Sequence, residues 1–175
     1  MIKNFFLILL LMISPIFLNA ASLVGDTVTI RHAYPSLTET WDAPETFTVQ
    51  AGTADRILFG NGHYYVNIEA DRILIDFISQ SAGWSPSEWN GLVVTGIDFS
   101  VTSVTTTSNW AGWSNSRVSF GADYVYFNWQ GMSSVSGTYI YADVQQQIPE
   151  PASYILISML LCGIFSIKKY KSCLF

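Results

Sequence analysis

The chain has 175 residues and a formal net charge of −5, and half of its residues are hydrophobic. The two ends distort these totals, because all the lysines lie within the first three and the last eight residues. Between residues 21 and 150, four arginines stand against all 13 acidic residues, so this part carries a net charge of −9. Such an acidic surface excludes nucleic acid as a partner and suits solubility outside the cell.

Both cysteines, Cys162 and Cys173, belong to the C-terminal tail, so residues 21–147 contain no thiol. This part therefore has no disulfide and must fold on its hydrophobic core. A chain of this size buries well over half of its unfolded surface, which is sufficient for one domain.

Residues 1–20 are typical of a Sec signal peptide. Lys3 supplies the positive charge, an apolar stretch runs from Phe5 to Leu18, and Ala20 is the small residue at the predicted cleavage site. The alternative is an N-terminal anchor that is not cleaved. In either case the sequence predicts that residues 21–147 are exported.

The exported part has the pattern of β-strands. Seven segments alternate apolar and polar side chains with a period of two, and they are rich in β-branched and aromatic residues. These segments are residues 27–31, 46–49, 66–69, 73–77, 97–101, 124–129 and 139–144. Gly60-Asn61-Gly62 is a strong turn signal. We predict an all-β fold over residues 21–147, as a single antiparallel β-sandwich or jelly-roll-like domain.

Two segments depart from this pattern. A short helical turn is predicted to begin at Ser85, with Pro86 in the first helical position, Glu88 completing a capping box and Gly91 ending it. Residues 102–108 are rich in threonine and serine, and we interpret them as an edge strand or a loop.

The C-terminal tail, residues 148–175, has three parts in a fixed order. They are Pro149-Glu150-Pro151, an uncharged run over residues 152–167, and the basic residues Lys168, Lys169 and Lys171. The prolines end any preceding strand, and the apolar run predicts a transmembrane helix. Its 16 residues cover about 24 Å, and lysine stems can extend this reach. The positive-inside rule places the lysines on the cytoplasmic side.

This order of parts resembles the PEP-CTERM sorting signal of Gram-negative bacteria that make exopolysaccharide. The resemblance implies that the helix holds the precursor in the inner membrane. It also implies that an exosortase, a multi-pass cysteine-dependent peptidase, cuts near Pro149-Glu150-Pro151 and sends the protein outward. The tail departs from the family in having lysines where arginine is commoner, and in residues 172–175 beyond them. The alternative is an ordinary single-pass anchor.

The exported part also resembles cargo domains that precede such tails. The resemblance is carried by residues 23–30, by Asn128-Trp129-Gln130-Gly131-Met132 and by Gly137-Thr138-Tyr139. It supports the predicted fold and the export, and it implies no particular chemistry.

Signals for catalysis are weak. With His32 and His63 as the only histidines and no cysteine, a zinc site lacks ligands, and each histidine is expected at the surface or at a strand end. Gly112-Trp113-Ser114-Asn115-Ser116 is only faintly similar to a nucleophile elbow, because the last glycine is missing, so it predicts a polar loop. A pair of carboxylates for glycoside hydrolysis stays open as an alternative.

No cofactor is expected, although a structural calcium ion stays open beside a plain solvated acidic surface. The acids available for it are Asp42, Glu45, Asp55, Asp71, Asp98, Asp123 and Asp143. Their spacing matches neither an EF-hand nor a nonapeptide repeat.

Six tryptophans are the most unusual feature of the composition. Trp129 falls on the apolar side of its segment and is predicted to lie in the core. The others are in loop-like contexts, and four are candidate carbohydrate-binding residues: Trp84, Trp89, Trp110 and Trp113. In the alternative interpretation, these rings close the end of the core.

Taken together, the sequence predicts a non-enzymatic, exported protein of the cell surface or of an exopolysaccharide (biofilm) matrix. Its expected partners are an exosortase, the inner membrane before processing, and an exopolysaccharide. The alternatives are a carbohydrate-binding module that uses loop tryptophans, a plain membrane-anchored envelope protein, and an unrecognised hydrolase.

Overall fold

The computed structural model describes residues 22–51 and 57–147. In these ranges the chain forms twelve strands and one three-residue 3-10 turn, and residues 21–147 form one compact unit. The elements are β1 (Thr27–Ala33), β2 (Glu45–Thr48), β3 (Ile57–Phe59), β4 (Tyr64–Ile68), β5 (Arg72–Phe77), β6 (Ala82–Gly83), β7 (Gly91–Thr95), β8 (Val101–Ser108), η1 (Asn115–Arg117), β9 (Val118–Phe120), β10 (Tyr124–Asn128), β11 (Ser133–Ser134) and β12 (Tyr139–Gln146).

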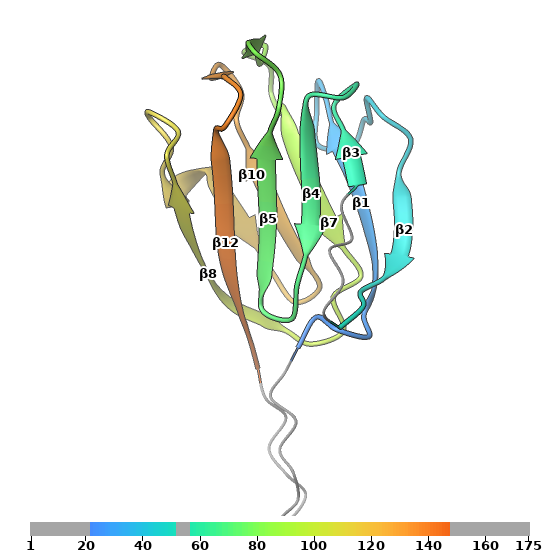
Figure 1. The fold of residues 1–175 in the computed structure, drawn as a ribbon. Coiled ribbons are helices and arrows are strands. Elements are labelled where there is room, and N and C mark those ends of the chain that lie inside the picture. The colour runs from blue at the N-terminus through green and yellow to red at the C-terminus, as the bar shows by residue number, and fades with distance from the viewer. Residues whose placement is uncertain (1–21, 52–56, 148–175) are drawn as a thin grey trace, which may run out of the picture. The chain divides into compact units, whose positions relative to one another are not determined.

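Ten strands build two five-stranded sheets that face each other (Figure 1). The first sheet has the order β2-β1-β7-β10-β9 and the second has the order β3-β4-β5-β12-β8. A small β11-β6 ribbon accompanies them, and every strand pair is antiparallel. The prediction of an all-β, antiparallel, sandwich-like domain is confirmed.

The core lies between the two sheets, because alternate side chains of each strand point inward. In the first sheet, Ile30 pairs with Val94 across β1 and β7, and both are buried. In the second sheet, Ile75 of β5 lies between Val66 and Ile140, and all three are fully buried. The intervening residues face outward and form the two solvent-facing surfaces of the sandwich.

Six of the seven predicted strand segments are confirmed, in β1, β2, β4, β5, β10 and β12. The predicted turn at Gly60-Asn61-Gly62 is also present between β3 and β4, with positive φ at all three residues. The predicted strand over residues 97–101 was wrong. Gly96, with a φ of 85°, turns the chain after β7, and Ile97 is buried but belongs to no strand.

The predicted helical turn from Ser85 to Gly91 was also wrong, because residues 85–90 form a loop and Gly91 begins β7. Tertiary contacts replace the helical pattern here. The Trp89 backbone N–H donates to the Pro35 carbonyl oxygen at 2.9 Å, and the Ser87 hydroxyl donates to the Trp89 carbonyl oxygen at 2.7 Å. The first bond ties the loop to the β1–β2 connection, and the second braces the loop internally.

The threonine-rich segment forms β8, at the edge of the second sheet beside β12, which confirms the edge-strand alternative. The predicted signal peptide and all three parts of the C-terminal tail lie outside the described residues. Among the residues that are described, no helix is long and apolar enough to cross a membrane.

Candidate functional site

Three tryptophans form an aromatic cluster inside the sandwich. Trp84, Trp110 and Trp129 are 3 %, 6 % and 0 % exposed. Their ring centroids lie 4.6 to 6.3 Å from Phe77, Tyr64 or one another, mostly edge to face. The predicted core position of Trp129 is confirmed. Trp84 and Trp110 present no open ring face for a sugar, so the alternative in which they close the core describes them better.

Trp113 extends this cluster toward the surface. Its ring stacks on Trp110 with a centroid distance of 6.1 Å and an interplanar angle of 9°. Its Nε1–H donates to the Thr106 hydroxyl of β8 at 2.9 Å. The half-buried ring is therefore held on one face and at its nitrogen, as a lid over the core.

His32 lies at the centre of the aromatic cluster, not at the surface or at a free strand end as expected. It continues the inward side of β1 after Ile30, and it is fully buried. Its Nδ1 is 2.8 Å from the Tyr64 hydroxyl and its Nε2 is 2.9 Å from the Asn90 side-chain oxygen. Burial lowers the pKa of His32 to about 4, against a smaller opposing effect of the Asn90 hydrogen bond. The ring is therefore neutral at neutral pH.

His63 is half-buried and lies in the turn before β4. Its Nδ1 is 2.6 Å from the Ser79 hydroxyl, and its carbonyl oxygen accepts the Ile78 N–H at 2.9 Å. In the described part of the chain no carboxylate bonds to His63, so the pair lacks the third member of a catalytic triad. The contacts fasten the β3–β4 turn to the end of β5. Ser114, in the predicted polar loop, bonds to Ser116 and not to a histidine.

Acidic side chains are dispersed over the domain. Among the described residues no three histidines, cysteines or acids come together as ligands of a metal ion. Asp42 accepts the backbone N–H groups of Gly60 and Asn61, and Asp143 pairs with Arg72. Asp26 is buried and accepts the Asp98 N–H, and burial raises its pKa. Of the candidate calcium ligands, Asp55 lies outside the described residues.

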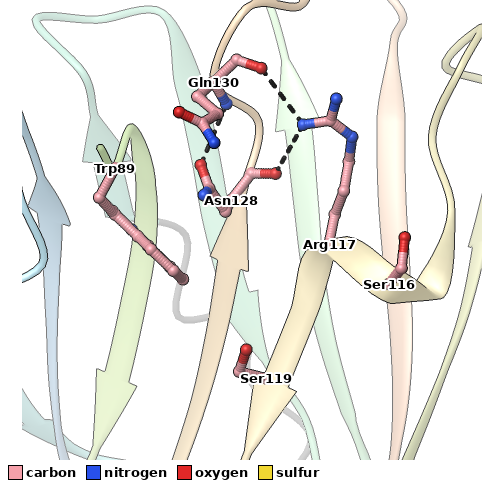
Figure 2. Close-up of a pocket in the computed structure, with 6 residues that line it drawn as sticks. All are labelled: Trp89, Ser116, Arg117, Ser119, Asn128 and Gln130. Carbon is pink, nitrogen blue, oxygen red and sulfur yellow. Dashed lines mark hydrogen bonds between the residues drawn. The ribbon is translucent and has the colours of Figure 1, made fainter. Parts of the chain in front are cut away.

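A polar pocket of about 290 Å³ lies on the outer face of the first sheet (Figure 2). Asn128 and Ser119 point outward there, since their neighbours Phe127 and Val118 face the core side. The lining residues are Trp89, Ser116, Arg117, Ser119, Asn128 and Gln130.

Trp89 and Arg117 lie on either side of Asn128 in this pocket (Figure 2). The Trp89 ring meets Tyr126 edge to face, with centroids 6.2 Å apart. Its loop is anchored to Pro35 by the Trp89 backbone N–H and braced internally by the Ser87 hydroxyl. Arg117 ends η1, and its Nη1 donates to the carbonyl oxygens of Asn128 and Gln130, each at 3.2 Å. Both side chains are therefore positioned before any ligand arrives.

The amides of the pocket are partly committed. The Asn128 side-chain oxygen accepts the backbone N–H groups of Gln130, at 3.1 Å, and of Asn90, at 3.3 Å. This turns the Asn128 amide nitrogen outward as a donor, and among the described residues no protein atom accepts from it. The Trp89 Nε1–H is also buried without an acceptor in the described part of the chain.

Sequence reasoning identified one wall of this pocket, Trp89, and missed the others. A signal was present for Asn128, which precedes the core residue Trp129 in an alternating segment and so faces outward, while Gln130 lies in the turn after β10. Arg117 carried no such signal, since only folding brings η1 beside β10. With geometry of this kind, the pocket can hold a small, oxygen-rich ligand between an indole and a set of fixed donors. No protein-family model, no curated protein and no solved structure matches this chain.

Proposed function

We propose that this chain is a non-enzymatic, exported protein of the cell surface or of an exopolysaccharide matrix. One observation carries the proposal: the sequence places Pro149-Glu150-Pro151, an uncharged apolar run and Lys168, Lys169 and Lys171 in the order of a sorting tail. In this proposal an exosortase-type peptidase of the inner membrane processes the tail, and the β-sandwich is the cargo that reaches the outside.

The properties of the sandwich support an extracellular role. It contains no thiol that an oxidising compartment could modify, and its acidic surface keeps it soluble. Its edge strand β8 is rich in threonine and polar on its outer side, which suits a strand that must not aggregate with copies of itself.

A non-enzymatic role is supported by the hydrogen bonds and ion pairs that already hold several side chains capable of acid–base chemistry. His32 is buried with both nitrogens bonded, and His63 fastens a turn. Asp42 and Asp143 are likewise held by backbone amides and by Arg72. Side chains used in this way have fixed structural partners rather than an open reaction space.

The proposal is tested by replacing Pro149, Glu150 and Pro151 with alanine in the full chain, in a host that encodes an exosortase. We expect the variant to insert into the inner membrane, because the apolar run is unchanged, and to stay there at full length. The wild type should instead appear in the outer fraction in a shortened form. Membrane fractionation and intact-mass measurement report both outcomes.

A matched control replaces Ser172, Cys173 and Leu174, which lie in the same tail beyond the basic residues, with alanine. It should be processed like the wild type. If the Pro149-Glu150-Pro151 variant is also shortened and released like the wild type, the tail acts as a plain anchor or is cut by a general protease, and the sorting proposal is wrong.

A second function, carbohydrate recognition, is favoured by one specific observation. In the outer-face pocket, an indole shares a hollow with two amides, two hydroxyls and a guanidinium. Aromatic walls with a few placed polar groups are the usual composition of small-ligand sites. Of the four predicted tryptophans, Trp89 is the one that this candidate function uses.

A further inference from the structure

Arg117 is unusual among the described arginines. Arg72 forms an ion pair with Asp143, and Arg31 donates through both of its terminal nitrogens to the carbonyl oxygens of Leu37 and Glu39. Arg117 uses Nη1 alone, for two backbone carbonyls, and within residues 22–51 and 57–147 it contacts no carboxylate. Arg31 likewise has no acidic partner among the described residues, but both of its terminal nitrogens are taken by carbonyls, so Arg117 is the described arginine whose Nη2 stays available for an external acid.

The hydrogen bonds of Arg117 also determine which of its donors remain available to a ligand. Because Nη1 is occupied by carbonyls, the remaining edge of the guanidinium is the one formed by Nε–H and Nη2–H. These two parallel donors match the two oxygens of a carboxylate, and such bidentate pairs are stronger and more directional than single hydrogen bonds. The two carbonyl bonds hold this edge in place in advance, so little side-chain freedom is lost on binding.

The rest of the pocket adds further donors and one aromatic wall. The Asn128 amide nitrogen and the exposed Ser119 hydroxyl donate to no protein atom among the described residues, and both are open to solvent. The Trp89 Nε1–H also lacks an acceptor there, but it is covered by protein atoms and faces no ligand. Accessible donors of this kind favour a ligand that is rich in acceptor oxygens. The indole of Trp89 can in turn cover the C–H face of such a ligand.

The size of the pocket limits the ligand to one small unit. Its volume of about 290 Å³ lies just below the range of roughly 300 to 1,000 Å³ for small-molecule sites. A ligand that combines a carboxylate, several hydroxyl oxygens and an apolar ring face in this space is an acidic sugar. We infer that the outer-face pocket binds a carboxylate-bearing saccharide unit, such as a hexuronate residue of an acidic polysaccharide. This inference rests on the second proposed function, carbohydrate recognition, and names its ligand class.

The negative charge of the domain opposes the binding of an anionic ligand, and a polymeric ligand can offset this repulsion. A net charge of −9 between residues 21 and 150 repels an anion at long range, so the affinity for one acidic sugar is modest. A polysaccharide presents many such units to many copies of the protein in a matrix, and the resulting avidity can exceed the single-site affinity by a factor of about 10² to 10⁴.

The test titrates the full chain, purified in detergent micelles, with three probes by saturation-transfer difference NMR. The probes are sodium D-glucuronate, D-glucose, which has the ring without the charge, and sodium acetate, which has the charge without the ring. We expect glucuronate to bind at least ten times more tightly than either of the others. Arg117→Gln should weaken glucuronate binding about ten-fold or more, and Trp89→Ala should weaken it similarly. The matched control Arg72→Gln removes the same charge from the other sheet and should leave binding unchanged.

Each other result has a distinct meaning. Equal binding of glucose and glucuronate overturns the acidic-sugar inference and leaves carbohydrate recognition in place. Equal binding of acetate and glucuronate shows a carboxylate site without sugar selectivity, and it overturns both. No binding of any probe also overturns both and leaves the proposed export untouched. If Arg117→Gln fails to fold, Arg117→Lys, which keeps the charge and loses the paired donors, replaces it and should likewise weaken glucuronate binding.

Discussion

At the scale of single residues, His32 shows how a polar ring is placed in an aromatic interior. Trp84 stacks over it at a centroid distance of 5.5 Å, and Tyr64 and Asn90 bond to its two nitrogens. The hydrogen bonds offset the loss of hydration of the neutral ring, and neither partner carries a charge that could hold a proton on it. His32 therefore couples the stability of the fold to pH.

We predict that acidification destabilises the domain through His32. The pKa of His32 is about 4 in the folded protein and near 6.5 in the unfolded chain. Between pH 4 and pH 6.5, His32 is therefore protonated in the unfolded chain and neutral in the folded protein. The stability that His32 provides is complete above about pH 6.5 and declines as the pH falls, by about 2 kcal/mol between pH 7 and pH 5. Urea denaturation of residues 21–147 at several pH values measures this slope.

The control for this prediction is His32→Gln, which keeps a donor and an acceptor but does not titrate in this range. It should be less stable than the wild type at pH 7 and should show a flatter dependence on pH. Asp26, whose pKa is raised by burial, acts in the opposite direction and is common to both proteins. Parallel slopes for the two proteins would contradict the assignment of the effect to His32.

At the scale of elements, the strands whose side chains alternate between apolar and polar were the ones that could be predicted from the sequence. Strands β1, β5 and β12 have one buried and one solvent-facing side, so their sequences alternate and their positions follow from a period of two. Strand β7 reads Gly-Leu-Val-Val-Thr and is buried on both sides, so it has no alternation to detect. Strands β6 and β11 are two residues long and are defined by pairing alone.

The candidate site was predictable only in part, for the same physical reason. Trp89 was identified because a tryptophan among small polar residues is conspicuous in any sequence. Arg117 is fixed by two carbonyl oxygens that lie 11 and 13 residues further along the chain, and it meets them because β9 and β10 pair. Local patterns do not contain this pairing. The capping box at Ser85 failed similarly, since contacts with distant Pro35 outweighed a local preference.

Gly91 provides a test of how tightly β7 is fitted between its neighbours. A Cβ added there would overlap the carbonyl oxygen of Phe127, which belongs to the backbone of β10 and cannot rotate away. We predict that Gly91→Ala forces the two central strands apart and lowers the free energy of unfolding by about 1–3 kcal/mol. Thermal or urea denaturation gives the difference.

The matched control is Gly83→Ala in β6, where an added Cβ meets nothing within 4 Å. Its effect should stay within about 0.5 kcal/mol. Equal stabilities of Gly91→Ala and the wild type would show that the β7–β10 spacing adapts freely, contrary to the prediction.

At the scale of the whole molecule, the distribution of chemistry along the sequence separates the sandwich from the two ends. The thiols and lysines belong to the ends, while the sandwich holds the arginines and every acid except Glu150. Its core is continuous between the two sheets, and the residues that form it all come from positions 23 to 144. The described residues of this core are all hydrophobic side chains of the sandwich itself.

From this distribution we predict that residues 21–147 fold without the ends of the chain. Far-UV circular dichroism of this fragment should show a sheet spectrum with almost no helix, because its described residues contain no α-helix and a single turn of 3-10 helix. Unfolding should be one cooperative transition, as expected for a single domain of this size. Dithiothreitol should leave the melting temperature unchanged, because there is no thiol to reduce, and chelation with EDTA serves as the parallel check for a structural calcium ion. A helical spectrum, or a fragment that melts without cooperativity while the full chain melts sharply, would mean that the ends contribute to the fold after all.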